Sequence, residues 1–112
     1  MTVAPKSTRT DMLKGTLDLL ILRTLELQPM HGIAVADRIA QVTNGTFSVG
    51  PGSLFPALHR LEQEGWIRGK WGVSEQGRRT RAYTLTAAGR RQLEKERQQW
   101  AVITAAVAQV LE

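Results

Sequence analysis

A helix with two very different faces is predicted between Gly50 and Gly65. Pro51 suits the first position of a helix, because its φ is already helical and its missing N–H is not needed there. Gly65 suits the position after the last turn. At about 100° per residue, one face collects apolar side chains that must be buried. These are Leu54, Ala57, Leu58 and Leu61.

The opposite face of this helix is small or polar and suits the major groove of DNA. It is centred on Gly52, Pro56, His59 and Gln63, and flanked by Ser53, Phe55 and Arg60. It carries no acidic residue near its start, and the major groove admits one helix that is read by its first turns. Pro56 removes a hydrogen bond inside the helix. This proline is either a harmless kink or part of a surface shaped to fit the groove.

The segments around this helix predict the fold class. Apolar spacing indicates helices at 12–27, 33–42 and 87–111, the first capped by Asp11 and the last by Thr86. Alternation indicates a very short strand at 46–49 and two strands at 67–73 and 79–85. The fold is therefore mainly α with a β-hairpin wing: a winged helix-turn-helix plus a C-terminal dimerisation helix. We expect a flexible arm at 1–10, a DNA-binding domain at 11–86 and the dimerisation helix at 87–112.

The predicted hairpin is strongly basic. Between Trp66 and Arg91 only Glu75 opposes seven basic residues: Arg68, Lys70, Arg78, Arg79, Arg81, Arg90 and Arg91. Such a run is either a solvated face or a phosphate-binding surface, and its place beside a candidate recognition helix favours phosphate binding. Trp66 and Trp71 are expected to face the core, and Tyr83 and Leu85 to anchor the second strand.

The last predicted helix carries an apolar seam. Leu93, Trp100, Ile103, Val107 and Val110 follow the spacing of a coiled coil, with Glu96 at the one polar seam position. A helix this long has little of its own domain left to cover it, so the seam predicts a homodimer. Trp100 either packs in that dimer or lines a pocket between protomers for a flat hydrophobic ligand.

Composition narrows the functional classes. The chain has 112 residues, a formal net charge of +5 and no cysteine, which excludes disulfides, cysteine zinc sites and a thiol nucleophile. This fits a reducing cytoplasm. No apolar run is long enough to predict a membrane-spanning segment, so no membrane is expected among the partners. His31 and His59 are far apart in sequence, so we expect no catalytic residues, no metal site and no cofactor, and hence not an enzyme.

Four segments resemble the PadR family of transcriptional regulators. They are Met12-Leu-Lys-Gly-Thr-Leu-Asp-Leu-Leu-Ile-Leu, His31-Gly-Ile, Gly52-Ser-Leu-Phe-Pro-Ala-Leu-His-Arg-Leu-Glu-Gln-Glu-Gly65 and Arg81-Ala-Tyr-Thr-Leu-Thr-Ala-Ala-Gly89. The single C-terminal helix is similar to the smaller of the family's two size classes. The chain has Phe55 where the family commonly has tyrosine, so a hydroxyl contact to DNA is absent there.

The resemblance implies a homodimeric repressor that binds a pseudo-palindromic double-stranded operator. The family's DNA contacts carry over onto Ser53, Phe55, Pro56 and His59, and onto a wing of Lys70, Arg78, Arg79 and Arg81; Arg60 flanks them and Lys14 is expected to touch phosphate. Members of the family often respond to phenolic or drug-like compounds, which implies a small aromatic effector.

Two other functions remain open on the sequence. A winged-helix protein-interaction module would be expected to carry a neutral or acidic wing, and this wing is basic. A structured-RNA binder would present exposed aromatic side chains for stacking.

Overall fold

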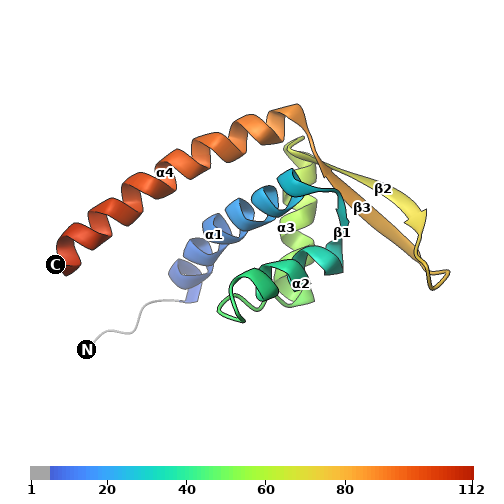
Figure 1. Cartoon of the computed structure of the whole chain (residues 1–112), viewed down its shortest axis with the longest axis horizontal. Coiled ribbons are helices and arrows are strands. Elements are labelled where there is room, and N and C mark those ends of the chain that lie inside the picture. The colour runs from blue at the N-terminus through green and yellow to red at the C-terminus, as the bar shows by residue number, and fades with distance from the viewer. Residues whose placement is uncertain (1–5) are drawn as a thin grey trace.

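The computed structural model describes the backbone of residues 6–112 and the side chains of residues 15–112. The elements in chain order are α1 (Lys6–Leu27), β1 (Met30–His31), α2 (Gly32–Val42), α3 (Pro51–Gln63), β2 (Ile67–Val73), β3 (Arg79–Leu85) and α4 (Ala87–Leu111). Figure 1 shows α1, α2 and α3 packed together, while the β2–β3 hairpin and α4 leave this body in opposite directions. The predicted mainly helical fold with a hairpin wing is confirmed.

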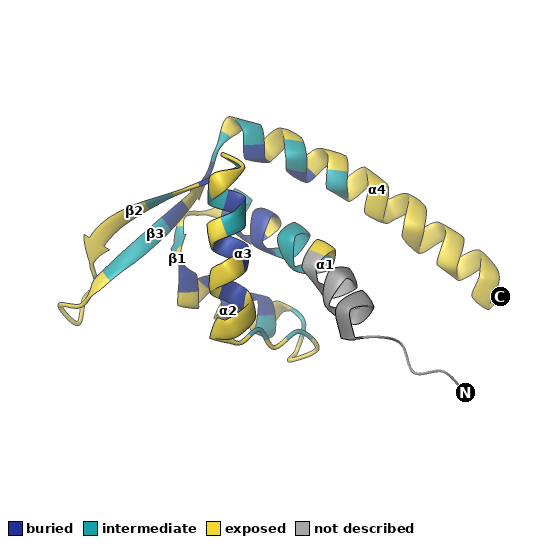
Figure 2. Ribbon diagram, turned by 180° about the vertical axis from the view of Figure 1, so that it is seen from behind, coloured by how far each residue is buried: buried dark blue, intermediate teal, exposed yellow. Residues whose placement is uncertain are grey.

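The hydrophobic core lies where the three helices meet the base of the hairpin. The buried face of α3 is the predicted one, with Leu54, Ala57, Leu58 and Leu61. Ile21 and Leu22 of α1 and Ile67 of β2 pack against it. Figure 2 shows this buried centre, and shows exposed residues over the outer hairpin and the far half of α4. Tyr83 and Leu85 anchor β3 as predicted.

The start of α4 is fixed against the hairpin. The Thr86 hydroxyl accepts a hydrogen bond from the Gly89 N–H at 3.0 Å, which caps the helix as predicted. Gly89 is buried, and a Cβ there would collide with the carbonyl oxygen of Trp66. Only glycine therefore lets α4 begin this close to the backbone of Trp66, just before β2.

Three local predictions were wrong. α1 begins at Lys6 rather than at residue 12, so residues 6–10 are helical rather than a flexible arm and Asp11 lies inside the helix. Residues 46–49 form no strand, because Asn44 and Gly45 turn the chain with positive φ values of 51° and 80° and the segment passes on as a loop. The third strand is instead β1, where Met30 pairs with Tyr83.

The sheet has the order β1-β3-β2 and is antiparallel. Its register pairs Ile67 with Leu85 near the core and Trp71 with Arg81 further out. Directly opposite residues point to the same side of a sheet. Trp71 and Arg81 therefore share the side that carries Tyr83, whose ring lies beside Phe55 and Leu58 of α3 around Gly32.

Leu93 does not belong to the exposed seam of α4. Its side chain is 1% exposed and is part of the protomer's own core. α1 and α4 are also joined by Arg97, which donates to Glu26 at 3.2 Å. The first turns of α4 thus complete the domain, and only the later turns are free to meet a partner.

Candidate nucleic-acid interface

The predicted exposed face of α3 is open to solvent. Gly52, Ser53, Phe55, Pro56 and His59 are all exposed. Pro56 lies inside the helix and has no N–H to donate to the carbonyl of Gly52 one turn earlier. The first turns of α3 therefore present small side chains, one aromatic ring and an imidazole, with no acidic residue in the first turn.

Arg60 occupies the edge of this face and has an internal partner. Its guanidinium forms an ion pair with the carboxylate of Asp18 in α1. Both side chains are partly buried. Arg60 was predicted as a DNA contact, but this ion pair favours a role in holding α3 against α1.

The basic residues of the wing divide into two groups. Arg68, Lys70, Arg78 and Arg79 are exposed. Arg81 turns inward instead: its guanidinium nitrogen lies 2.6 Å from a carboxylate oxygen of Glu62 in α3 and 3.1 Å from the Gly69 carbonyl oxygen. The predicted phosphate contacts at Lys70, Arg78 and Arg79 are accessible, whereas Arg81 is engaged within the protein.

Trp71 lies on the side of the hairpin that faces α3, as its alternation predicted, but it is not buried in the core. Its side chain is 54% exposed, because the body of the domain covers only the inner part of the hairpin. The guanidinium of Arg79 lies 4.6 Å from the centre of its ring and that of Arg81 lies 5.4 Å away. Trp66, by contrast, is partly buried against the core as predicted.

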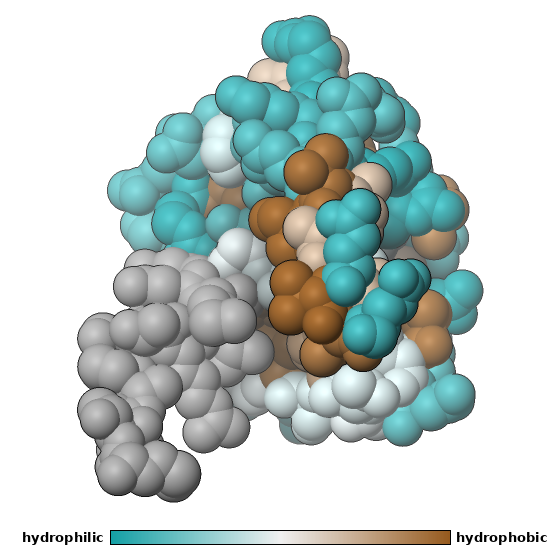
Figure 3. Space-filling model, turned by 90° about the vertical axis from the view of Figure 1, so that its left-hand side faces the viewer, coloured by the Kyte–Doolittle hydropathy of each residue, from teal (hydrophilic) through white to brown (hydrophobic). Residues whose placement is uncertain are grey.

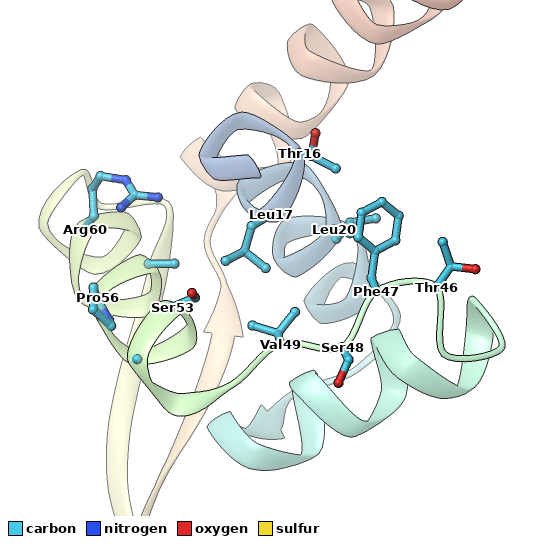
Figure 4. Close-up of a pocket in the computed structure, with 12 residues that line it drawn as sticks. Thr16, Leu17, Leu20, Thr46, Phe47, Ser48, Val49, Ser53, Pro56 and Arg60 are labelled. Carbon is cyan, nitrogen blue, oxygen red and sulfur yellow. The ribbon is translucent and has the colours of Figure 1, made fainter. Parts of the chain in front are cut away.

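A cavity of about 420 Å³ lies between α1, the loop after α2 and the start of α3. Figure 4 shows Leu17 and Leu20 of α1 and Phe47 and Val49 of the loop around it. Ser53, Pro56 and Arg60 of α3 form the opposite wall. Sequence reasoning missed this cavity, because it depends on how the loop folds back over α1.

The outer half of α4 carries exposed apolar side chains. Trp100 is 47% exposed, and Ile103, Val107 and Val110 are exposed further along the helix. Figure 3 views the molecule from the C-terminal end of α4 and shows hydrophobic side chains gathered in the middle of that face. Four of the five predicted seam residues are therefore exposed in the single protomer.

Glu96 lies between these two parts of α4. Burial raises the pKa of its carboxyl group, and the negative charge of Asp18 raises it further. Its Oε2 atom is buried and accepts no hydrogen bond from the described residues. Glu26 behaves oppositely, since the hydrogen bond from Arg23 holds the pKa of Glu26 below its usual value although burial opposes this.

In the part of the chain whose side chains are described, no group of acidic or histidine residues could hold a metal ion. Within those same residues no helix is long and apolar enough to cross a membrane. Lys14, predicted to contact phosphate, lies outside the residues whose side chains are described.

Comparisons with known proteins point to transcriptional regulators. The model of the Transcriptional regulator PadR-like family matches residues 21–95. A transcriptional regulator of Mycobacterium tuberculosis is 46% identical over 55 residues, which cover 46% of this chain and 47% of that protein. The chain thus spans about half the length of this relative.

Solved structures resemble most of the chain. A transcriptional regulator from Clostridium thermocellum has a TM-score of 0.83 at 22% identity and covers 91% of this chain and 99% of its own. A PadR-like transcriptional regulator from Bacillus cereus has a TM-score of 0.76 at 28% identity, over 91% of this chain and 97% of its own.

Proposed function

Because this chain belongs to the PadR-like family of transcriptional regulators, we propose that it is a sequence-specific DNA-binding repressor that acts as a homodimer. The observation that carries the proposal is the exposed face of α3 beside a wing whose outward cations are free of internal acidic partners among the described residues. Family members and structural neighbours are transcriptional regulators, not enzymes.

In this proposal α3 reads the operator through its first turns. Ser53 and His59 are exposed there, and their polar atoms suit base edges in the major groove. Lys70, Arg78 and Arg79 bind phosphates and fix the position of the protein on the duplex. A cytoplasmic location, where the bacterial chromosome lies, would suit this role.

The homodimer is supported by the exposed side chains of α4. A monomer would leave Trp100, Ile103 and Val107 in water, and burying such side chains against a second copy is favourable. A dimer with two-fold symmetry presents two copies of α3 and therefore matches a pseudo-palindromic operator. Bound across a promoter, it would repress by excluding other proteins.

An effector is the remaining part of the proposal. Trp100 lies on the α4 seam, so a flat aromatic compound bound between two copies would contact its ring. Planar phenolic compounds should quench Trp100 fluorescence and release DNA at the same concentrations. Quenching that persists in Trp100→Phe would move the effector site elsewhere, and the cavity beneath α3 is the next place to search.

Competition binding tests the proposed function. A labelled duplex from the region upstream of the protein's own gene is displaced by unlabelled copies of itself or of a shuffled sequence at one salt concentration. The self sequence should compete more strongly, and His59→Ala should narrow the difference by about tenfold, as expected for one base contact. Equal competition by both sequences would contradict specific recognition, and no binding of the labelled duplex would favour a protein-interaction module or an RNA binder.

A further inference from the structure

An exposed tryptophan on the wing has no role in the hydrophobic core. Ile67, Tyr83 and Leu85 lie on the same side of the hairpin as Trp71 and are buried, whereas Trp71 is 54% exposed. Tryptophan offers a large apolar surface with a polar N–H, and it is enriched at interfaces for that reason. Its position two residues beyond Gly69 places it on the sheet side that faces α3.

Two arginine side chains lie near this ring, and only one of them is held by an acidic partner. Arg79 is exposed, and its guanidinium lies 4.6 Å from the ring centre. Arg81 lies 5.4 Å from the ring centre and is held by Glu62. A cation over an indole face is attracted by the ring quadrupole. The ring therefore has one fixed cation and one that is free to turn toward an outside anion.

Glu62 joins this part of the wing to the recognition helix. One of its carboxylate oxygens accepts from Arg81 at 2.6 Å and from the backbone N–H of Gly69 at 3.1 Å. A Cβ at Gly69 would collide with the Arg81 guanidinium as it is placed, so a larger residue there would displace that side chain. Through these contacts α3 sets the direction of the outer hairpin and, through Arg81, of the Trp71 ring.

We propose that Trp71 is a DNA-contacting residue of the wing, whose indole packs against deoxyribose at the edge of the groove while Arg79 binds the adjacent phosphate. Glu62 and Arg81 are positioning residues that hold the ring in its place on the wing. A sugar contact fits the chemistry, since deoxyribose offers apolar C–H groups next to an anion and the wing offers an apolar ring next to a cation. This inference rests on the proposed DNA-binding function.

Fluorine NMR of protein labelled with 5-fluorotryptophan follows each tryptophan separately, with Trp71→Phe identifying its resonance. A mixed-sequence duplex is added at low salt, and binding is followed in parallel by the anisotropy of a fluorescent label on the DNA. The Trp71 resonance should shift and lose its solvent exposure, while the resonance of Trp66 stays in place. Duplex binding with an unchanged Trp71 resonance would overturn the inference alone. No duplex binding at all would overturn the proposed function and the inference with it.

Substitutions separate contact from positioning. Trp71→Ala should weaken duplex binding about tenfold without changing the salt slope, because it removes no charge. Arg79→Ala should lower the slope by about one. Glu62→Gln should shift the Trp71 resonance in the free protein, which a residue without influence on the ring would not do. Val42→Ala on α2 is the matched control, since it removes an exposed apolar side chain away from the wing. Equal affinity of Trp71→Ala and Val42→Ala would contradict the contact.

Discussion

Arg60 of α3 forms an ion pair with Asp18 of α1. The pair is partly buried and joins two helices that are far apart in sequence. It therefore positions α3 in the domain from the side opposite to Glu62, which ties the same helix to the wing.

Loss of this ion pair should destabilise the domain. Asp18→Asn leaves Arg60 without its charged partner at that site, and we expect the free energy of unfolding to fall by about 1–2 kcal/mol. Urea denaturation measures this, with Arg38→Ala on the exposed surface of α2 as the control. In Arg60→Ala, the slope of log DNA affinity against log salt concentration should stay unchanged, because Arg60 is not a phosphate contact in this account. A lower slope in Arg60→Ala would return Arg60 to the DNA interface.

The exposed wing cations should contribute to binding of every duplex alike. Lys70→Ala and Arg78→Ala should each lower the slope of log affinity against log salt by about one, because each phosphate contact releases counterions. Arg81→Ala removes the same charge but should mainly lower thermal stability, since Arg81 is engaged with Glu62. Equal slopes for all three variants would mean that exposure does not distinguish these residues.

The periodicity of the sequence predicted much of which side chains are buried and which are exposed in α3 and the wing, but not all of it. Helical spacing identified both faces of α3, and alternation identified both strands of the wing and the side on which Trp71 lies. Whether that side is covered depends on how far the domain extends, which no local pattern encodes. β1 was missed for a similar reason, since Met30 and His31 are extended only because β3 offers them an edge.

The pairs that position α3 were also beyond the sequence. Glu62 and Arg81 are separated by a helix end, a turn and most of the hairpin, and Asp18 and Arg60 by β1, α2 and a loop. Opposite charges are common along the chain, so their spacing gives no signal of contact. Leu93 fitted the apolar seam of α4, yet its burial in the core shows that one helical stripe serves two different surfaces.

Glu96 should make stability depend on pH. Burial raises the pKa of its carboxyl group above the ordinary 4.5, so the folded protein binds this proton more tightly than the unfolded chain. The resulting stabilisation is complete below pH 4.5 and is lost as the pH rises through the raised value. Glu96→Gln should therefore melt at a higher temperature than the wild type at neutral pH, and the advantage should shrink in acid. Glu75→Gln at the exposed hairpin turn is the control. A constant difference across pH would contradict the role of burial.

The outer half of α4 should hold two copies together. Ile103→Glu with Val107→Glu places charges on the exposed seam, so light scattering should show monomers and DNA binding should weaken. Ala105→Glu is the matched control, because it lies on the opposite side of the same helix and should leave dimers intact. Unchanged dimers in the double variant would place the interface elsewhere.

Selection from a pool of random duplexes tests the central claim most directly. The claim is that two copies of α3 read a specific sequence, with the wing supplying affinity that is common to all DNA. After successive rounds of binding and amplification, the account predicts one enriched motif with two-fold symmetry and half-sites about one helical turn, or a multiple of it, apart. A bound pool without any enriched motif would contradict sequence-specific recognition, and an enriched motif without symmetry would contradict the homodimer.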